Sequence, residues 1–102
     1  MHSSIVIQMS TIEEICKQYA VKRLILTGSA ARDDFDPEKS DVDFIVEFDG
    51  LEDLFDRFFQ LKSSLESTFS RTVDVIQRGA ITNPYLLASL DEDAVAVYEA
   101  QP

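Results

Sequence analysis

The sequence is poor in the residues from which several common kinds of site are built. Its 102 residues include one histidine, His2, and one cysteine, Cys16. A Ser-His-Asp triad, a Cys-His pair and a His-ligated zinc site are therefore not expected, because each needs more such side chains in suitable places. A lone cysteine cannot form an internal disulfide, which fits a reducing, cytoplasmic setting.

Basic residues and long apolar runs are scarce as well. Nine Lys and Arg stand against 19 Asp and Glu, which gives a formal net charge of −10. Direct binding to nucleic acid, which needs clustered basic side chains, is therefore not expected. No apolar run approaches the ~20 residues of a transmembrane helix, and the N-terminus lacks the pattern of a secretory signal. We expect one domain over residues 1–102, with residues 1–9 either disordered or forming an edge strand.

Apolar periodicity predicts strands separated by helices. The expected strands are residues 22–26, 41–48, 71–76 and a short one at 94–98. The expected helices are one capped by Ser10 or Thr11 that ends near Ala20, a short one at 29–32, a long one at 51–69 and one at 85–90. This order predicts an α+β fold in which one mixed sheet carries helices on one face.

The long helix is the clearest element, because leucines and phenylalanines recur in it at three- and four-residue intervals. Two interpretations of its phenylalanines are open. They could line a groove for a partner or ligand, or they could pack in the core against the sheet. Core packing is the favoured interpretation, since large aromatic side chains are usually buried.

The most informative stretch is a polar segment between the first two expected strands. It opens with Gly28, which permits a tight turn, and Ser29, which can cap a short helix. Free N–H groups at such a helix start would suit a phosphate. The segment closes with Asp41 and Asp43, whose side chains lie on one face of the sheet if a strand begins there.

Two neighbouring carboxylates repel each other, and a cation is the natural compensation. Carboxylates combined with substrate phosphates are the ligands that suit Mg²⁺. The pattern therefore favours metal-assisted phosphoryl or nucleotidyl transfer. The alternative is a solvated junction between loop and strand, with Ser40 as a cap. A further carboxylate, Asp74, interrupts the third apolar strand, where an unpartnered buried charge would be costly.

The combination of Gly28-Ser29, Arg32 and Ser40-Asp41-Val42-Asp43 resembles the DNA polymerase beta-like nucleotidyltransferase superfamily, and within it the minimal nucleotidyltransferases (MNT). The resemblance implies a palm-like mixed sheet in which the first three core strands are adjacent. It also implies that Asp74 joins Asp41 and Asp43 as catalytic and metal-binding residues for two Mg²⁺ ions. The nucleotide, ATP, would be bound by Gly28, Ser29, Arg32 and Ser40.

The same resemblance implies a biological role. In the minimal family such proteins are antitoxins that act beside a helical HEPN-domain toxin. The implied reaction transfers AMP from ATP to a tyrosine hydroxyl of that toxin.

Two departures from the family pattern keep a second function open. Eleven residues, rather than the usual ten, separate Ser29 from Asp41, and Ala30 stands where the family often has Arg. On the second view the chain is a non-catalytic module that neutralises its partner by forming a complex.

Overall fold

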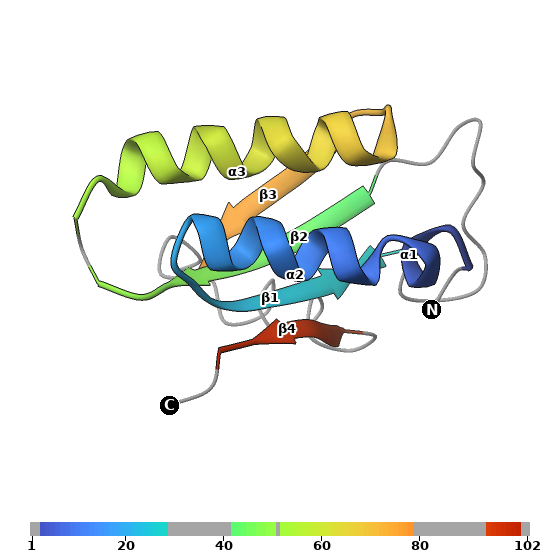
Figure 1. Ribbon diagram of the computed structural model, residues 1–102, viewed down its shortest axis with the longest axis horizontal. Coiled ribbons are helices and arrows are strands. Elements are labelled where there is room, and N and C mark those ends of the chain that lie inside the picture. The colour runs from blue at the N-terminus through green and yellow to red at the C-terminus, as the bar shows by residue number, and fades with distance from the viewer. Residues whose placement is uncertain (1–2, 29–41, 51, 79–93, 101–102) are drawn as a thin grey trace.

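The computed structural model describes residues 3–28, 42–50, 52–78 and 94–100, and in these ranges it shows helices packed on one face of a sheet (Figure 1). The elements in chain order are α1 (Ser3–Ile7), α2 (Met9–Gln18), β1 (Val21–Thr27), β2 (Val42–Phe48), α3 (Leu54–Phe69), β3 (Val73–Gln77) and β4 (Val95–Glu99). The expected α+β class with a mixed sheet is confirmed. No helix in the described ranges is long and apolar enough to cross a membrane.

The sheet has the strand order β3-β2-β1-β4. β1 pairs antiparallel with both β2 and β4, whereas β2 and β3 are parallel. The parallel pair is connected through α3, because parallel neighbours need a crossover connection. The three strands expected to be adjacent are therefore neighbours, with β2 in the middle.

The core lies between the helices and the sheet. Alternate residues of each strand point into it, as the period of two predicts. Fully buried members from β1, β2 and β3 are Leu24, Leu26, Val42, Phe44, Val46 and Val73. They meet helix residues Ile5, Ile12, Cys16, Leu61 and Leu65. The side chains between them on β2, which begin with Asp43, consequently face the other side of the sheet.

A single arginine ties the ends of several elements together. The guanidinium of Arg57 in α3 donates hydrogen bonds to four backbone carbonyl oxygens at 2.7–2.9 Å, those of Tyr19, Ala20, Asp49 and Glu52. It also lies 4.8 Å from the centre of the Phe48 ring. Arg57 thus fixes the start of α3 against the end of α2 and the turn after β2.

Two expectations about the helices are wrong. Residues 3–7 form the helix α1, neither disordered nor a strand, because Ile5 inserts fully into the core. The next helix begins at Met9 without a side-chain cap, so neither Ser10 nor Thr11 caps it. The short helices expected at 29–32 and 85–90 lie outside the described residues.

The prediction that the phenylalanines of α3 pack in the core is also wrong for two of them. Phe55 is 74% and Phe59 52% exposed, whereas Phe58 and Phe69 are half-buried against the core. The reason is the sheet order: α3 lies along β3, which is the outermost strand of the described sheet. The helix side away from α2 therefore extends past the last strand.

Candidate active site

The candidate site lies where three adjacent strands begin or end. β1 ends at Thr27, and β2 and β3 begin at Val42 and Val73. Thr27 is the cross-strand partner of Asp43, and Asp43 is in turn the partner of Asp74. The three residues therefore form one row across the sheet.

The row presents two carboxylates to the same side of the sheet. Register partners on neighbouring strands point to the same face, and neighbouring strands lie about 4.8 Å apart. The flanking residues Val42, Phe44 and Val73 are completely buried under the helices, so Asp43 and Asp74 face away from the helices. Asp43 is half-buried and Asp74 is exposed. The structure thus brings together two of the three predicted carboxylates.

Gly28, directly after β1, touches this row. Its φ of +74° lies in the left-handed region, which glycine adopts without strain. A Cβ atom at this position would lie 2.5 Å from Asp43 Oδ2. The Asp43 carboxylate can therefore occupy its position only because residue 28 has no side chain.

The residues present fit a divalent cation. Their donor atoms are carboxylate oxygens, which are hard ligands of the kind that Mg²⁺ prefers. Two such groups in adjacent register supply negative charge on one surface, and the lack of a side chain at Gly28 leaves room for the Asp43 carboxylate. Within the described ranges no group of three potential metal ligands occurs. Further ligands would come from elsewhere in the chain, from a substrate or from water.

The remaining predicted site residues are Ser29, Arg32, Ser40 and Asp41, and all lie outside the described residues. The described neighbours bracket them closely, since Gly28 precedes Ser29 and Val42 follows Asp41. Gly28 and Asp43, which lie at or next to the described ends of this segment, are close together. The polar segment therefore starts and ends at the candidate site.

One neighbour of the carboxylates was missed by the sequence analysis. Thr27 is 3% exposed and is the one polar residue that is buried within the described ranges. Its position beside Asp43 follows from the antiparallel register of β1 and β2, which could not be read from the sequence. The signal that was available is its place directly before the Gly28-Ser29 turn.

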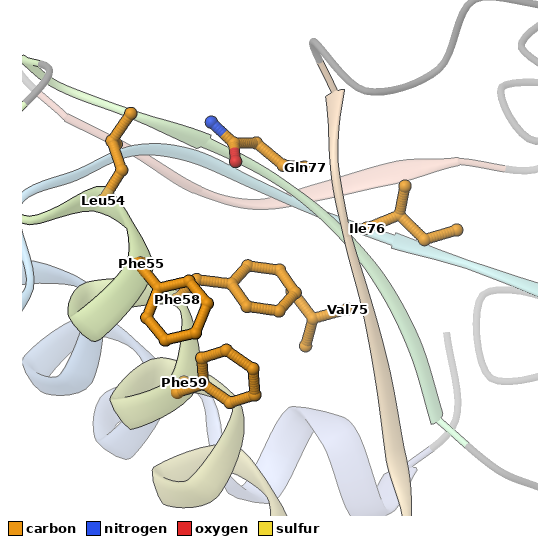
Figure 2. Close-up of a pocket in the computed structure, with 7 residues that line it drawn as sticks. All are labelled: Leu54, Phe55, Phe58, Phe59, Val75, Ile76 and Gln77. Atoms are coloured by element: carbon orange, nitrogen blue, oxygen red, sulfur yellow. The ribbon is translucent and has the colours of Figure 1, made fainter.

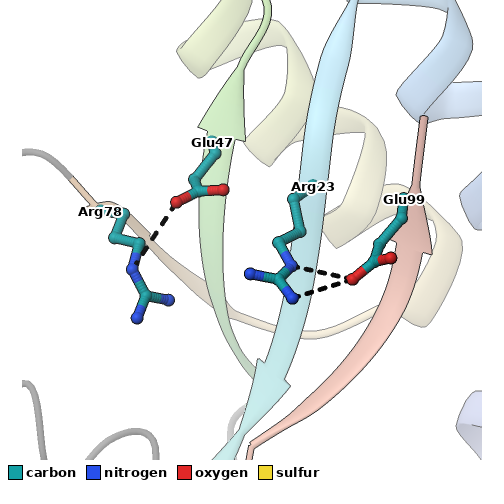
Figure 3. A network of polar contacts seen from close by, with 4 residues as sticks. All are labelled: Arg23, Glu47, Arg78 and Glu99. Atoms are coloured by element: carbon teal, nitrogen blue, oxygen red, sulfur yellow. Dashed lines mark hydrogen bonds and ion pairs between the residues drawn. The ribbon is translucent and has the colours of Figure 1, made fainter. Parts of the chain in front are cut away.

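The same face of the sheet also carries paired charges farther from the row (Figure 3). Arg23 of β1 donates to Glu99 of β4, with Nε and Nη2 at 3.0 and 2.9 Å from Oε1. Arg78 Nε lies 3.6 Å from Glu47 Oε1. Glu47, which follows Asp43 by four residues on β2, therefore has a basic partner of its own.

The lone cysteine plays no part in this face. Cys16 is fully buried in the core under the sheet. Removal from water disfavours the thiolate and raises the pKa of Cys16 to about 12. A nucleophilic role for the thiol is therefore inconsistent with its surroundings.

Comparison with known proteins gives a consistent picture. A family model for the nucleotidyltransferase domain matches residues 9–97. A relative from Methanocaldococcus jannaschii, named as a candidate protein adenylyltransferase, is 40% identical over 81 residues, which are 79% of this chain and 81% of the relative.

Solved structures share the fold at low identity. A candidate minimal nucleotidyltransferase aligns with a TM-score of 0.75 at 23% identity and covers 89% of this chain and 90% of its own. A chain from the complex of a tri-AMPylated Shewanella oneidensis HEPN toxin with an MNT antitoxin aligns with a TM-score of 0.64 at 15% identity, over 93% of this chain and 72% of its own. The family match over 9–97 includes the Gly28 turn and both described carboxylates, and the chain belongs to the nucleotidyltransferase domain family, with the fold of a minimal nucleotidyltransferase.

Proposed function

We propose that this chain is a magnesium-dependent adenylyltransferase that moves AMP from ATP onto a tyrosine hydroxyl of a partner protein. The partner is a HEPN-domain toxin, and the chain acts as its antitoxin. The observation that carries the proposal is the register of Asp43 with Asp74, beside a glycine that leaves room for the Asp43 carboxylate. Membership of the nucleotidyltransferase family supports the reaction class.

The relatives support the choice of substrate. The M. jannaschii relative is named for adenylyl transfer to protein, and one structural neighbour comes from a complex with an AMPylated HEPN toxin. The acidic character of the chain, with a net charge of −10, argues for a protein acceptor over a nucleic acid.

Asp43 and Asp74 would hold the metal, with Asp41 as a third ligand. When bound, magnesium supplies charge neutralisation for the triphosphate and the leaving pyrophosphate. Gly28 and Ser29 would bind phosphate oxygens through backbone N–H groups, helped by Arg32 and Ser40.

The chemical step requires a hydroxyl to lose a proton. Asp74 is exposed on the face that an acceptor would approach, so its carboxylate can accept the proton of the tyrosine hydroxyl. The hydroxyl oxygen then bonds to the α-phosphorus, and the bond from this phosphorus to the bridging oxygen of pyrophosphate breaks. The row of side chains acts mainly by holding the reactants in line.

The proposal is tested by incubating the chain with ATP labelled at the α-phosphate, Mg²⁺ and the protein encoded by the adjacent reading frame. We expect label on a tyrosine of that protein, and its loss in the Asp43→Asn variant. A neighbour that never acquires label would count against adenylyl transfer.

Neutralisation by complex formation alone is the second candidate function. The exposed pair Phe55 and Phe59 favours it, because such a surface is suited to binding another protein. The double variant Asp41→Ala/Asp43→Ala separates the two functions. Full neutralisation of the partner by this variant would favour binding, whereas loss of neutralisation would favour catalysis.

A further inference from the structure

An apolar groove lies between α3 and β3, on the side of the helix away from α2 (Figure 2). It has a volume of about 560 Å³ and is lined by Leu54, Phe55, Phe58, Phe59, Val75, Ile76 and Gln77. In Figure 2 Val75 and Gln77 point from β3 toward the helix, and Ile76 points to the opposite side of the strand. The groove therefore borders the outermost strand of the described sheet.

The aromatic side chains of the groove support one another. The rings of Phe55 and Phe59 lie 4.7 Å apart, and those of Phe58 and Phe59 meet edge to face at 5.7 Å. Such pairs hold large side chains in place and reduce the entropy lost when a partner binds. Phe55 and Phe59 are one helical turn apart, so they form a short apolar ridge along α3.

The rim of this groove is acidic. Glu52, Asp53 and Asp56 are exposed at the start of α3, next to Phe55. None of them belongs to an ion pair in the part of the chain that the structure describes. The nearby Arg57 directs its guanidinium to four backbone carbonyl groups, so four of its five N–H groups are already engaged.

We propose that this groove is the docking surface for an amphipathic helix of another protein, with apolar residues on one side and Lys or Arg beside them. A helix fits because Phe55 and Phe59 are four residues apart, and side chains at this spacing form the ridges through which two helices pack. Basic flanks fit because they would face the acidic rim. A second copy of this chain does not fit, since it would bring the same three carboxylates and a net charge of −10.

The groove and the candidate active site share β3 but lie on opposite faces of the sheet, because Val75 faces α3 and Asp74 faces away from the helices. Asp74 and Ile76 lie on the same face of this strand, about 7 Å apart along it. A protein that docks in the groove and extends past the edge of β3, over Ile76, would come near Asp74 on the other face of the sheet. That the docked protein is also the acceptor of AMP rests on the proposed function, whereas the docking itself does not.

Binding can be measured by fluorescence anisotropy with a labelled synthetic peptide that carries Leu at helical spacing and Lys at the other positions. The groove variant is Phe55→Ser/Phe59→Ser. The matched control is Val6→Ser/Ile7→Ser, which removes apolar side chains of similar exposure, 51% and 78%, from α1. We expect the groove variant to bind at least about tenfold more weakly and the control variant to stay within about twofold of the unmodified chain.

A second peptide with Glu in place of Lys tests the charge requirement, and it should bind at least about tenfold more weakly than the Lys peptide. The proposal would be overturned if the groove and control variants lost peptide affinity equally, or if neither variant lost affinity. Sedimentation data showing a dimer that the groove variant dissociates would also overturn it, because the occupant would then be a second copy.

Thermal unfolding tests whether other residues of the same chain cover the groove. Substitution of exposed side chains should shift the Tm of the groove variant by less than about 4 °C, and a drop of 10 °C or more would overturn the proposal. The Asp43→Asn variant should bind the Lys peptide like the unmodified chain. Peptide binding without any adenylyl transfer would therefore refute the proposed function alone.

Discussion

Replacement of Gly28 by alanine tests how the glycine and Asp43 depend on each other. The added Cβ would lie 2.5 Å from Asp43 Oδ2, whereas ordinary contact begins at 3.4 Å. The carboxylate must therefore move by about 1 Å, and a displacement of this size can lower a reaction rate about a hundredfold. We expect Gly28→Ala to lower adenylyl transfer by about that factor and to weaken Mn²⁺ binding, measured by water proton relaxation.

The cost to stability should be modest, because the atom that must move is at the end of a side chain. What remains is the strain of a Cβ at a φ of +74°, about 1 kcal/mol, which corresponds to a fall in Tm of about 4–8 °C in a domain of this size. Gly50 provides a matched control, since its φ is +75° and nothing lies within 4 Å of a Cβ added there.

Gly50→Ala should therefore lose as much stability as Gly28→Ala but keep its transfer activity and its Mn²⁺ binding. Activity of Gly28→Ala within about threefold of Gly50→Ala would refute this prediction, because the close approach of residue 28 to Asp43 would then have no effect on the reaction.

Two further predictions concern the rest of the fold. Arg57→Ala should lower the free energy of unfolding by about 2 kcal/mol in urea denaturation, because four carbonyl groups lose a charged donor. Arg23→Ala, which removes an exposed ion pair with Glu99, should lower the free energy of unfolding by less than about 1 kcal/mol. Equal losses of stability in Arg57→Ala and Arg23→Ala would contradict this prediction. The pKa of Cys16 is raised by burial to about 12 from 9.0, so the thiol favours the folded state below pH 9, and this contribution is lost as the pH rises from 9 toward 12. Stability should therefore fall less steeply above pH 9 in Cys16→Ala than in the unmodified chain, and equal slopes would contradict the assigned burial.

The succession of helices and strands along the chain, and the face on which each residue of β2 lies, could be predicted because they depend on local patterns. Alternation around Asp43 identified which residues of β2 enter the core. The adjacency of β2 and β3 came from the resemblance, since no local signal states which strands pair. The partnership of Thr27 with Asp43 depends on register, which a sequence leaves open until strand pairing is known.

The phenylalanines show a different limit of sequence analysis. The periodicity of α3 correctly predicts a helix with an apolar side, and Leu61 and Leu65 are fully buried as this requires. The periodicity does not show how far the sheet extends beneath the apolar side of the helix. Phe55 and Phe59 are exposed because β3 is the last described strand, which is a property of the whole sheet.

The most direct test of the central claim is adenylyl transfer by the Asp74→Asn variant, measured as label from the α-phosphate of ATP on the partner protein. Asp74 is exposed, so this change should leave the stability nearly unaltered. Asp49→Asn, at an exposed aspartate after β2, serves as the control. We expect a loss of at least about a hundredfold in Asp74→Asn and full activity in Asp49→Asn. Unchanged labelling by Asp74→Asn would contradict a catalytic role for the Asp43–Asp74 row.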